Sequence, residues 1–473
     1  MTDLIVEISK YLITFLFALY AYECFSSFRG KLSDEKRQRI FKRQMFLMYL
    51  IHLDAYLAIY AVTDDIEMIL FYVVQVAFAA ITISCYRLIY PRSSGLLVNN
   101  MCMLLMLGFI MLTRLSVDKA YKQFAIAVGS MVLTLVIPVL IQKVKFLRRV
   151  PWLYAVIGIL GLAVVLVLGA TSSGAKISIA VFGIGIQPSE FIKILFVFFI
   201  ACMLYEKTDF KRVCITTLLA AAHVLILVCS RDLGGALIFF IAYLVMLYVA
   251  TRKLFYFAGG ILAGCIAAVV AYNLFAHVRV RVLAWKDPLS VIEDQGYQIS
   301  QSLFAIGTGG WFGMGLYQGM PEKIPVVEQD FIFSAIAEEL GGIFALCLLM
   351  VCVSCFLMFF NVAMQMKEQF YKLIALGLGT VYGFQVFLTV GGAVKFIPST
   401  GVTLPLVSYG GSSLLATMIV FAIVQGLYIL RQDEGNVNEK RDGTKQRQAG
   451  TRRQHAAAKR RKTGFDEEIE DFS

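Results

Sequence analysis

Residues 294–342 read DQGYQISQSLFAIGTGGWFGMGLYQGMPEKIPVVEQDFIFSAIAEELGG, a long polar and Gly-rich stretch between apolar segments. Glycines alternate with aromatic residues along its first half. Connections of this length are usually either functional or disordered, and the alternation favours an ordered loop. The charged residues in its second half include Lys323, Glu328 and Asp330. We therefore expect the chemistry of this protein to be found in this loop.

The rest of the chain has the composition of a membrane protein. Its 473 residues are 59% hydrophobic and 16% charged, with a mean hydropathy of +0.75. Soluble domains contain about 45–50% apolar and about 25% charged residues. Runs of roughly 20 apolar residues recur, and each can cross a bilayer as a helix. The sequence therefore predicts an all-α, polytopic membrane bundle with about thirteen spans, near residues 4–24, 44–63, 66–86, 96–115, 121–141, 151–170, 189–205, 213–229, 233–250, 254–275, 331–360, 371–394 and 412–430.

Lys and Arg in the short loops predict the orientation, because cytoplasmic loops are enriched in both. Loop 26–43 is strongly basic, which places it in the cytoplasm. Alternation then puts the N-terminus and residues 276–330 outside and the C-terminus in the cytoplasm. Loop 114–122 is the awkward one, because it is assigned outside although it carries three basic residues, Arg114, Lys119 and Lys122.

Three segments differ in character. Residues 1–92 contain three predicted spans, and residues 93–430 contain the polar loop and the other ten. Residues 431–473 carry eleven Lys and Arg and are predicted to be a disordered, basic cytoplasmic tail. Such a tail adheres to anionic membrane lipids or docks a cytoplasmic partner. The net charge of +11 largely follows from the basic cytoplasmic loops, so nucleic-acid binding is not implied.

Four polar islands fall on the predicted outer side. The first, residues 174–193, contains a QPSE tetrapeptide at a predicted helix start, Gln187, Pro188, Ser189 and Glu190. Proline and an acidic residue both suit a first helical turn, so a purely structural cap is an alternative. The second island, RDLGG at 231–235, contains Asp232, which can form a local ion pair or serve the site. The His and Cys residues show no metal-ligand spacing, and no metal site is predicted.

The third island extends from residue 279 to residue 342 and the fourth from 395 to 413. Asp330 ends the long loop and opens a predicted span, so it is either functional or a helix cap. Glu338 and Glu339 follow in that span and should face the bundle interior or a wet cavity, where pairing with a basic residue is the alternative. The fourth island, KFIPSTGVTLPLVSYGGSS, predicts a structured re-entrant loop, which is tolerated at membrane depth only beside protein or water.

These islands resemble the motifs of the SEDS proteins (shape, elongation, division and sporulation), the family that contains FtsW, RodA and SpoVE. GYQISQSLFAIGTGG at 296–310 is similar to the family's GYQxxQSLxAIGSGG, and DFIF at 330–333 to its TDFIF. The fourth island is similar to LPxTGxTLPFxSYGGSS. Glu328 and Gln329 stand where the family often has His and Thr. The resemblance covers about 96–430 and implies a ten-helix core, which leaves residues 1–92 as an extension whose removal should spare the fold.

The resemblance implies a peptidoglycan glycosyltransferase that polymerises lipid II at the outer face of the bacterial cytoplasmic membrane, in division, elongation or sporulation. It implies Asp330 as general base, a class B penicillin-binding protein as partner, and a leaving pyrophosphate stabilised by basic residues, with or without Mg²⁺ or Mn²⁺. A lipid II flippase and a non-catalytic scaffold stay open as alternatives. The substrate contacts that it suggests are Arg281, Gln298, Gln301, Ser302, Lys323, Glu338, Glu339, Lys395, Thr400, Ser408, Tyr409 and Ser412.

Overall fold

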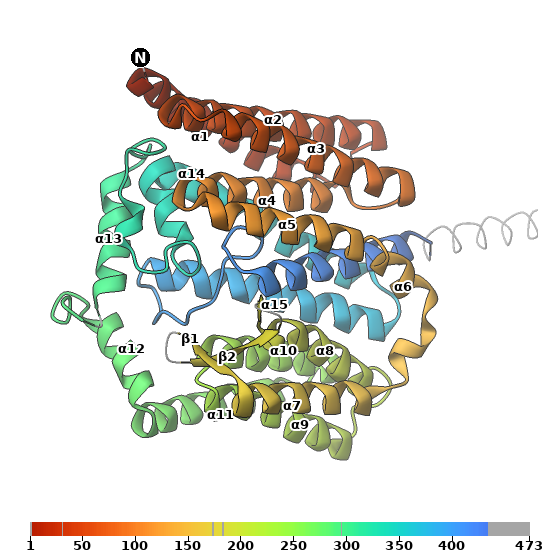
Figure 1. Cartoon of the computed structure of the whole chain (residues 1–473). Coiled ribbons are helices and arrows are strands. Elements are labelled where there is room, and N and C mark those ends of the chain that lie inside the picture. Colours follow the sequence, from red (N-terminus) through yellow and green to blue (C-terminus); the bar gives the residue numbers. More distant parts are fainter. Residues whose placement is uncertain (1, 31, 173–174, 182–183, 295, 434–473) are drawn as a thin grey trace, which may run out of the picture.

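The structure, a computed structural model, is a bundle of long helices that run side by side (Figure 1). It describes residues 2–433 apart from 31, 173–174, 182–183 and 295, so most of the predicted tail lies outside the described residues. Twelve helices in the described part are long and apolar enough to cross a membrane. The thirteenth predicted span, α8 (Pro188–Leu204), is a helix of 17 residues. The prediction of a polytopic helical membrane protein is confirmed.

The first three helices form a layer on one side of the bundle (Figure 1). They pack against helices of the predicted core, mainly α4 and α14. α4 is the most enclosed of the spans, because 94% of the residues in its most apolar stretch are buried. The layer and its neighbours therefore share one interior. The elements are α1 (Thr2–Ser26), α2 (Asp34–Thr63), α3 (Ile66–Ile89), α4 (Gly95–Leu115) and α14 (Ile332–Gln365).

The remaining long helices complete the bundle around α15 (Gln369–Ala393). α11 lies at its edge, and none of its residues is buried. These helices are α5 (Val117–Thr134), α6 (Ile137–Lys143), α7 (Pro151–Leu168), α9 (Phe210–Cys229), α10 (Leu233–Thr251), α11 (Leu254–Leu274) and a C-terminal helix (Gly411–Asp433).

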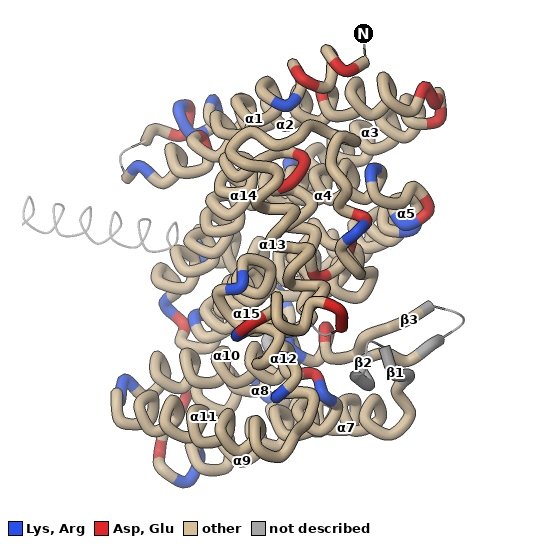
Figure 2. The backbone as a smooth tube through the Cα atoms, turned by 90° about the vertical axis from the view of Figure 1, so that its left-hand side faces the viewer, with Lys and Arg blue, Asp and Glu red and all other residues tan. Residues whose placement is uncertain are grey.

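Two further helices, α12 (Ala276–Lys286) and α13 (Tyr297–Gly309), cross the ends of the bundle on one side (Figure 1). We call this side the motif face. The N-terminus lies on the same side, whereas the C-terminal helix ends on the opposite side. Figure 2 views the molecule from the motif face and shows acidic and basic positions among the loops around α12, α13 and α15.

The described residues also contain a small antiparallel sheet, which the prediction of an all-α protein did not include. It has the order β1-β2-β3 and lies between α7 and α8 in the sequence. The local sequence ISIAVFGIGI alternates with a period of two, which is typical of strands rather than of helices. The strands are β1 (Ala170–Ser172), β2 (Ala175–Val181) and β3 (Ile184–Ile186).

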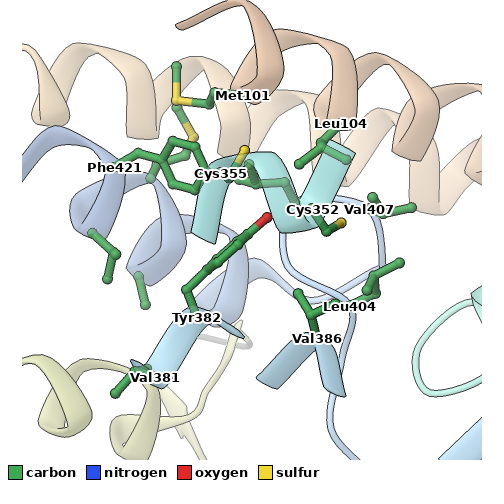
Figure 3. Packing of buried hydrophobic residues seen from close by; sticks show 14 of the residues in the cluster. Met101, Leu104, Cys352, Cys355, Val381, Tyr382, Val386, Leu404, Val407 and Phe421 are labelled. Atoms are coloured by element: carbon green, nitrogen blue, oxygen red, sulfur yellow. The ribbon is translucent and has the colours of Figure 1, made fainter. Parts of the chain in front are cut away.

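The interior is packed by apolar side chains from α4, α14, α15 and the C-terminal helix. Figure 3 shows Tyr382 of α15 reaching towards Cys352 and Cys355 of α14, with Met101 of α4 and Phe421 of the C-terminal helix nearby. All five side chains are buried. The CxxC pair thus lies within the packed interior, where cysteine behaves as a small apolar residue.

Candidate functional site

Asp330 lies at the end of the long loop, beside the re-entrant loop of the fourth island. Its carboxylate Oδ2 is 3.5 Å from the position that a Cβ would take at Gly401. Gly401 has φ +72°, a backbone conformation that favours glycine and brings the two loops together. α14 begins at Ile332, and Phe331 occupies its cap position without a side-chain cap bond. The helix-cap alternative for Asp330 is therefore not observed.

The surroundings of Asp330 raise its basicity. The pKa of Asp330 is raised to about 6. Burial is the largest cause, the positive charge of Arg281 opposes it, and the negative charge of Glu328 adds to it. A general base works best with a pKa near the operating pH, because it must be both ionised and basic. Asp330 meets this requirement at neutral pH.

Arg281 of α12 interacts electrostatically with two acidic residues, Asp330 and Asp232. Burial lowers the pKa of its guanidinium, and both carboxylates oppose that shift. Its Nη1 donates to the carbonyl oxygen of Ser399 at 3.4 Å. Trp285, one turn further along α12, donates from Nε1 to the carbonyl oxygen of Lys395 at 3.1 Å. These bonds fix α12, and with it the Arg281 cation, to the re-entrant loop.

The QPSE tetrapeptide meets Asp232 and the fourth island. Asp232 caps α10, with Oδ1 accepting from the amide of Gly235 at 2.8 Å, and Ser189 Oγ donates to its Oδ2 at 3.5 Å. The amide of Gln187 donates to Ser412 Oγ at 3.0 Å. Burial raises the pKa of Asp232, and the Gly235 amide is the largest opposing influence. The first, second and fourth islands therefore converge, and Pro188 starts α8 as predicted.

Lys193 is a residue of this site that the sequence analysis missed. It is buried, and its Nζ donates to Glu190 Oε2 at 2.6 Å and to Gln385 Oε1 at 2.8 Å. Gln385 in turn donates to the carbonyl oxygen of Thr403 at 3.0 Å. The available signal was a lysine one helical turn after Glu190 in an otherwise apolar run. Lys193 thereby joins α8, α15 and the re-entrant loop.

Glu338 and Glu339 are engaged by the protein itself. Arg114 at the end of α4 donates from Nε to Glu339 Oε1 at 2.7 Å, and Glu338 Oε1 accepts from the amide of Met320 at 3.0 Å. Both glutamates are buried. The internal pairing that was the alternative for these acids is thus observed for Glu339. It also accounts for one basic residue of the awkward loop 114–122.

The glycines of the long loop bring it against the backbone of α14. A Cβ at Gly309 would lie 2.1 Å from the carbonyl oxygen of Ala337, and one at Gly313 would lie 2.3 Å from that of Glu339. The amide of Gly315 donates to the same Glu339 oxygen at 2.8 Å. α14 itself is interrupted at Gly341, where φ is 92° and ψ is 165°. The close approach that these glycines permit is therefore to protein backbone.

Several predicted substrate contacts form hydrogen bonds between neighbouring helices and loops of the site. Ser302 Oγ is 2.6 Å from Ser334 Oγ, Ser408 Oγ donates to the carbonyl oxygen of Gln329 at 2.5 Å, and Gln298 Nε2 donates to that of Pro325 at 2.9 Å. Their direct contact with a substrate stays a prediction, as it does for the remaining four candidates. Of those four, Lys323 is exposed. The other three, Gln301, Lys395 and Tyr409, are half-buried.

Thr400 differs from the other candidates. Its Oγ1 is buried and finds no hydrogen-bond partner among the described residues. Buried polar groups in proteins are almost always hydrogen-bonded. Thr400 follows Ser399, the residue whose carbonyl accepts from Arg281, so the unpaired hydroxyl lies within the converging islands.

The four islands thus form one site on the motif face. A family model described as "Cell cycle protein" (FTSW_RODA_SPOVE) matches residues 95–432. The chain belongs to the FtsW/RodA/SpoVE family. The resemblance found in the motifs is confirmed, and residues 1–94 lie outside the matched range.

Relatives and solved structures agree with this membership. The chain is 34% identical over 363 residues to the peptidoglycan glycosyltransferase RodA of Mycobacterium bovis, covering 71% of this chain and 77% of that protein. It is 34% identical over 268 residues to the stage V sporulation protein E of Bacillus subtilis, covering 54% and 71%. A solved chain from work on "polymerization and crosslinking by a peptidoglycan synthase complex" has a TM-score of 0.61 at 26% identity, covering 72% and 98%.

Proposed function

We propose that this family member polymerises lipid II into peptidoglycan glycan strands, with Asp330 as general base. Relatives such as the RodA of Mycobacterium bovis are named as peptidoglycan glycosyltransferases. The observation that carries the proposal is the position of Asp330, a carboxylate with a pKa of about 6 next to Arg281, where the four islands converge. The proposed site lies at the outer face of the bacterial cytoplasmic membrane.

The proposed reaction transfers the growing glycan from its lipid pyrophosphate to the acceptor lipid II. Asp330 removes the proton from the acceptor's sugar hydroxyl, and the hydroxyl oxygen attacks the anomeric carbon of the donor. The bond from that carbon to the pyrophosphate breaks, and the lipid pyrophosphate leaves with the bonding electrons. The proton remains on Asp330 until solvent removes it. A single displacement of this kind inverts the sugar and needs no covalent enzyme intermediate.

Basic residues are proposed to stabilise the pyrophosphate that leaves. Cations placed where negative charge develops lower the barrier of such transfers. Arg281 is suited because it already interacts with two carboxylates, and Lys395 and Lys323 lie in the two loops that flank Asp330. The described residues contain no group of three or more His, Cys, Asp or Glu that could hold a metal ion. Participation of Mg²⁺ or Mn²⁺ with the pyrophosphate stays a prediction.

The proposed orientation has the motif face and the N-terminus outside and the C-terminus in the cytoplasm. Loop 114–122 is an exception to the charge rule in this orientation, because it is basic although it is placed outside. The structure supplies a reason for the exception, because Arg114 is paired with Glu339, and Lys119 with Glu328. Cysteine labelling from either side of the membrane at position 3 tests the orientation. Labelling of intact cells at that position is expected.

The proposed partner is a class B penicillin-binding protein, whose transpeptidase would crosslink the new strands. The support comes from the similar solved chain, which was studied as part of a peptidoglycan synthase complex for polymerization and crosslinking. Co-purification of the full chain with candidate penicillin-binding proteins of the same organism tests this partner.

Asp330→Asn tests the proposed base. The amide keeps the size of the side chain but cannot accept the proton, and a positioned general base contributes about 10²–10⁴-fold to rate. We expect the variant to insert and fold normally but to make almost no glycan from purified lipid II, measured by gel separation of the strands with and without the partner.

Three outcomes contradict the proposal. Near-normal polymerisation by a well-folded Asp330→Asn protein removes Asp330 as the base. A wild-type protein that makes no glycan with any partner, yet moves lipid II across vesicle membranes, identifies a flippase instead. Neither activity in a protein that still assembles the complex identifies a scaffold.

A further inference from the structure

An ion pair joins α5 to the loop that carries Asp330. Glu328 lies two residues before Asp330, where the family often has His, and Lys119 of α5 pairs with its carboxylate through Nζ and Oε1. The Glu328 side chain is 14% exposed, so the pair is partly shielded from water. The Lys119 ammonium also lies 5.9 Å from the ring centre of Tyr409 in the re-entrant loop.

The same region joins the two loops that meet at Asp330. The amide of Tyr409 donates to the carbonyl oxygen of Glu328 at 2.7 Å, and Ser408 Oγ donates to that of Gln329 at 2.5 Å. Gln123, one turn after Lys119 on α5, donates from Nε2 to the carbonyl oxygen of Ser408 at 3.0 Å. α5 therefore holds both loops through a lysine and a glutamine on one face of the helix.

Strained backbone is also present on both sides of this contact. Val326 has φ 56° and Leu406 has φ 67°, although neither is a glycine. Branched residues with positive φ are uncommon, and such strain persists only when surrounding contacts fix it. The bonds from α5 and between the loops supply that fixation. The position of Asp330, which follows in the same loop, depends on them.

Two charged groups act on the Asp330 carboxylate, and two more act on those groups. Arg281 approaches it from α12 and Glu328 from its own loop. Asp232, at the start of α10, acts on Arg281 through its negative charge. Lys119 faces Glu328 from α5. The charge of Glu328 therefore acts on Asp330 only to the extent that Lys119 does not neutralise it.

We propose that Lys119 and Glu328 form a positioning pair that fixes the loop of Asp330 and sets the pH at which Asp330 becomes an active base. This inference rests on the proposed function of Asp330. Removal of Lys119 leaves the negative charge of Glu328 uncompensated, which favours the protonated form of Asp330. Removal of the Glu328 charge favours the ionised form. The two changes therefore shift the acidic limb of the activity profile in opposite directions.

The experiment measures kcat/KM for lipid II polymerisation against pH in the full-length protein with its partner. The acidic limb of kcat/KM reports the ionisation of the free enzyme. Lys119→Met is expected to move its midpoint to higher pH, and Glu328→Gln to lower pH. A shift of one unit corresponds to tenfold less ionised Asp330 below the midpoint. Lys119→Arg should keep the wild-type midpoint. The double variant with Lys119→Met and Glu328→Gln should have a midpoint closer to that of Glu328→Gln than to that of Lys119→Met.

A matched control is Lys122→Met, which removes an exposed lysine one turn away on α5 and should leave the midpoint unchanged. Glu328→Gln preserves shape, so it remains informative even where Lys119→Met fails to fold. Identical midpoints for wild type, Lys119→Met and Glu328→Gln, with Asp330→Asn inactive, overturn the pair and leave the base assignment intact. An Asp330→Asn protein that still polymerises overturns both.

Discussion

Removal of residues 1–92 should prevent the rest of the chain from folding stably. The sequence suggested the opposite, because the family motifs all begin after this segment. The structure places α1 and α2 against α4 and α14, and α4 is buried almost throughout. Truncation would expose polar side chains of α4, Asn99 and Asn100, to lipid. Polar groups at membrane depth are costly unless other helices satisfy them.

The size of the loss follows from the contacts that cross the boundary. Among the described residues, six hydrogen bonds join α1 and α2 to α4 and α14. Interhelical bonds in membranes contribute about 0.6 kcal/mol each, so together these six contribute about 4 kcal/mol. Globular proteins are stable by only about 5–15 kcal/mol. The pairs are Thr14 with Leu340, Tyr20 and Cys24 with Asn100, Tyr56 with Thr113, and Phe41 and Gln44 with Asn99. Aromatic packing adds to them, as Phe17 stacks on Phe344 at 4.2 Å.

The assay compares full-length and truncated protein in detergent by size-exclusion profile and thermal unfolding. Little monodisperse protein is expected after truncation, and co-expression of residues 1–92 as a separate chain should restore part of it. Tyr20→Phe isolates one hydrogen bond, and Leu19→Ala on the exposed face of α1 is its matched control. A truncated protein that is monodisperse and melts at the wild-type temperature would refute the reasoning.

Two further substitutions test the junction between the long loop and α14. Arg114→Met should lower the free energy of unfolding by about 3–5 kcal/mol, because it leaves Glu339 buried without its partner. Glu339→Gln should cost less, and a double-mutant cycle of thermal unfolding that shows no coupling would exclude the pair. Gly313→Ala should destabilise the protein, since φ is +82° and the new Cβ would lie 2.3 Å from a carbonyl oxygen. Gly307→Ala is its control, because a Cβ there meets nothing within 4 Å, and equal melting temperatures for both would contradict the backbone contact.

The spans and the membership of the site were largely predictable from the sequence. Runs of apolar residues are long enough to give one helix each, and the motif residues Glu190, Asp232 and Asp330 converge as their common side of the membrane suggested. A polar island in an apolar chain is a strong local signal, since few positions in a bilayer protein tolerate charge.

The partners of the charged residues were not predictable, because pairing depends on segments far apart in the sequence. Arg114 and Lys119 violated the charge rule for outer loops, and their acidic partners follow more than 200 residues later. Lys193 lay in an apolar run that indicated only a span. The glycines of the long loop signalled close approach but not its target, which is the backbone of α14.

The burial of α4 also bears on the order in which the chain enters the membrane. Synthesis proceeds from the N-terminus, so α1, α2 and α3 emerge from the ribosome before α4. Asn99 and Asn100 therefore arrive where Gln44, Phe41 and Tyr20 already offer hydrogen bonds. The added N-terminal helices thus provide a receiving surface for α4 during biogenesis, before the long loop and its aspartate have been translated.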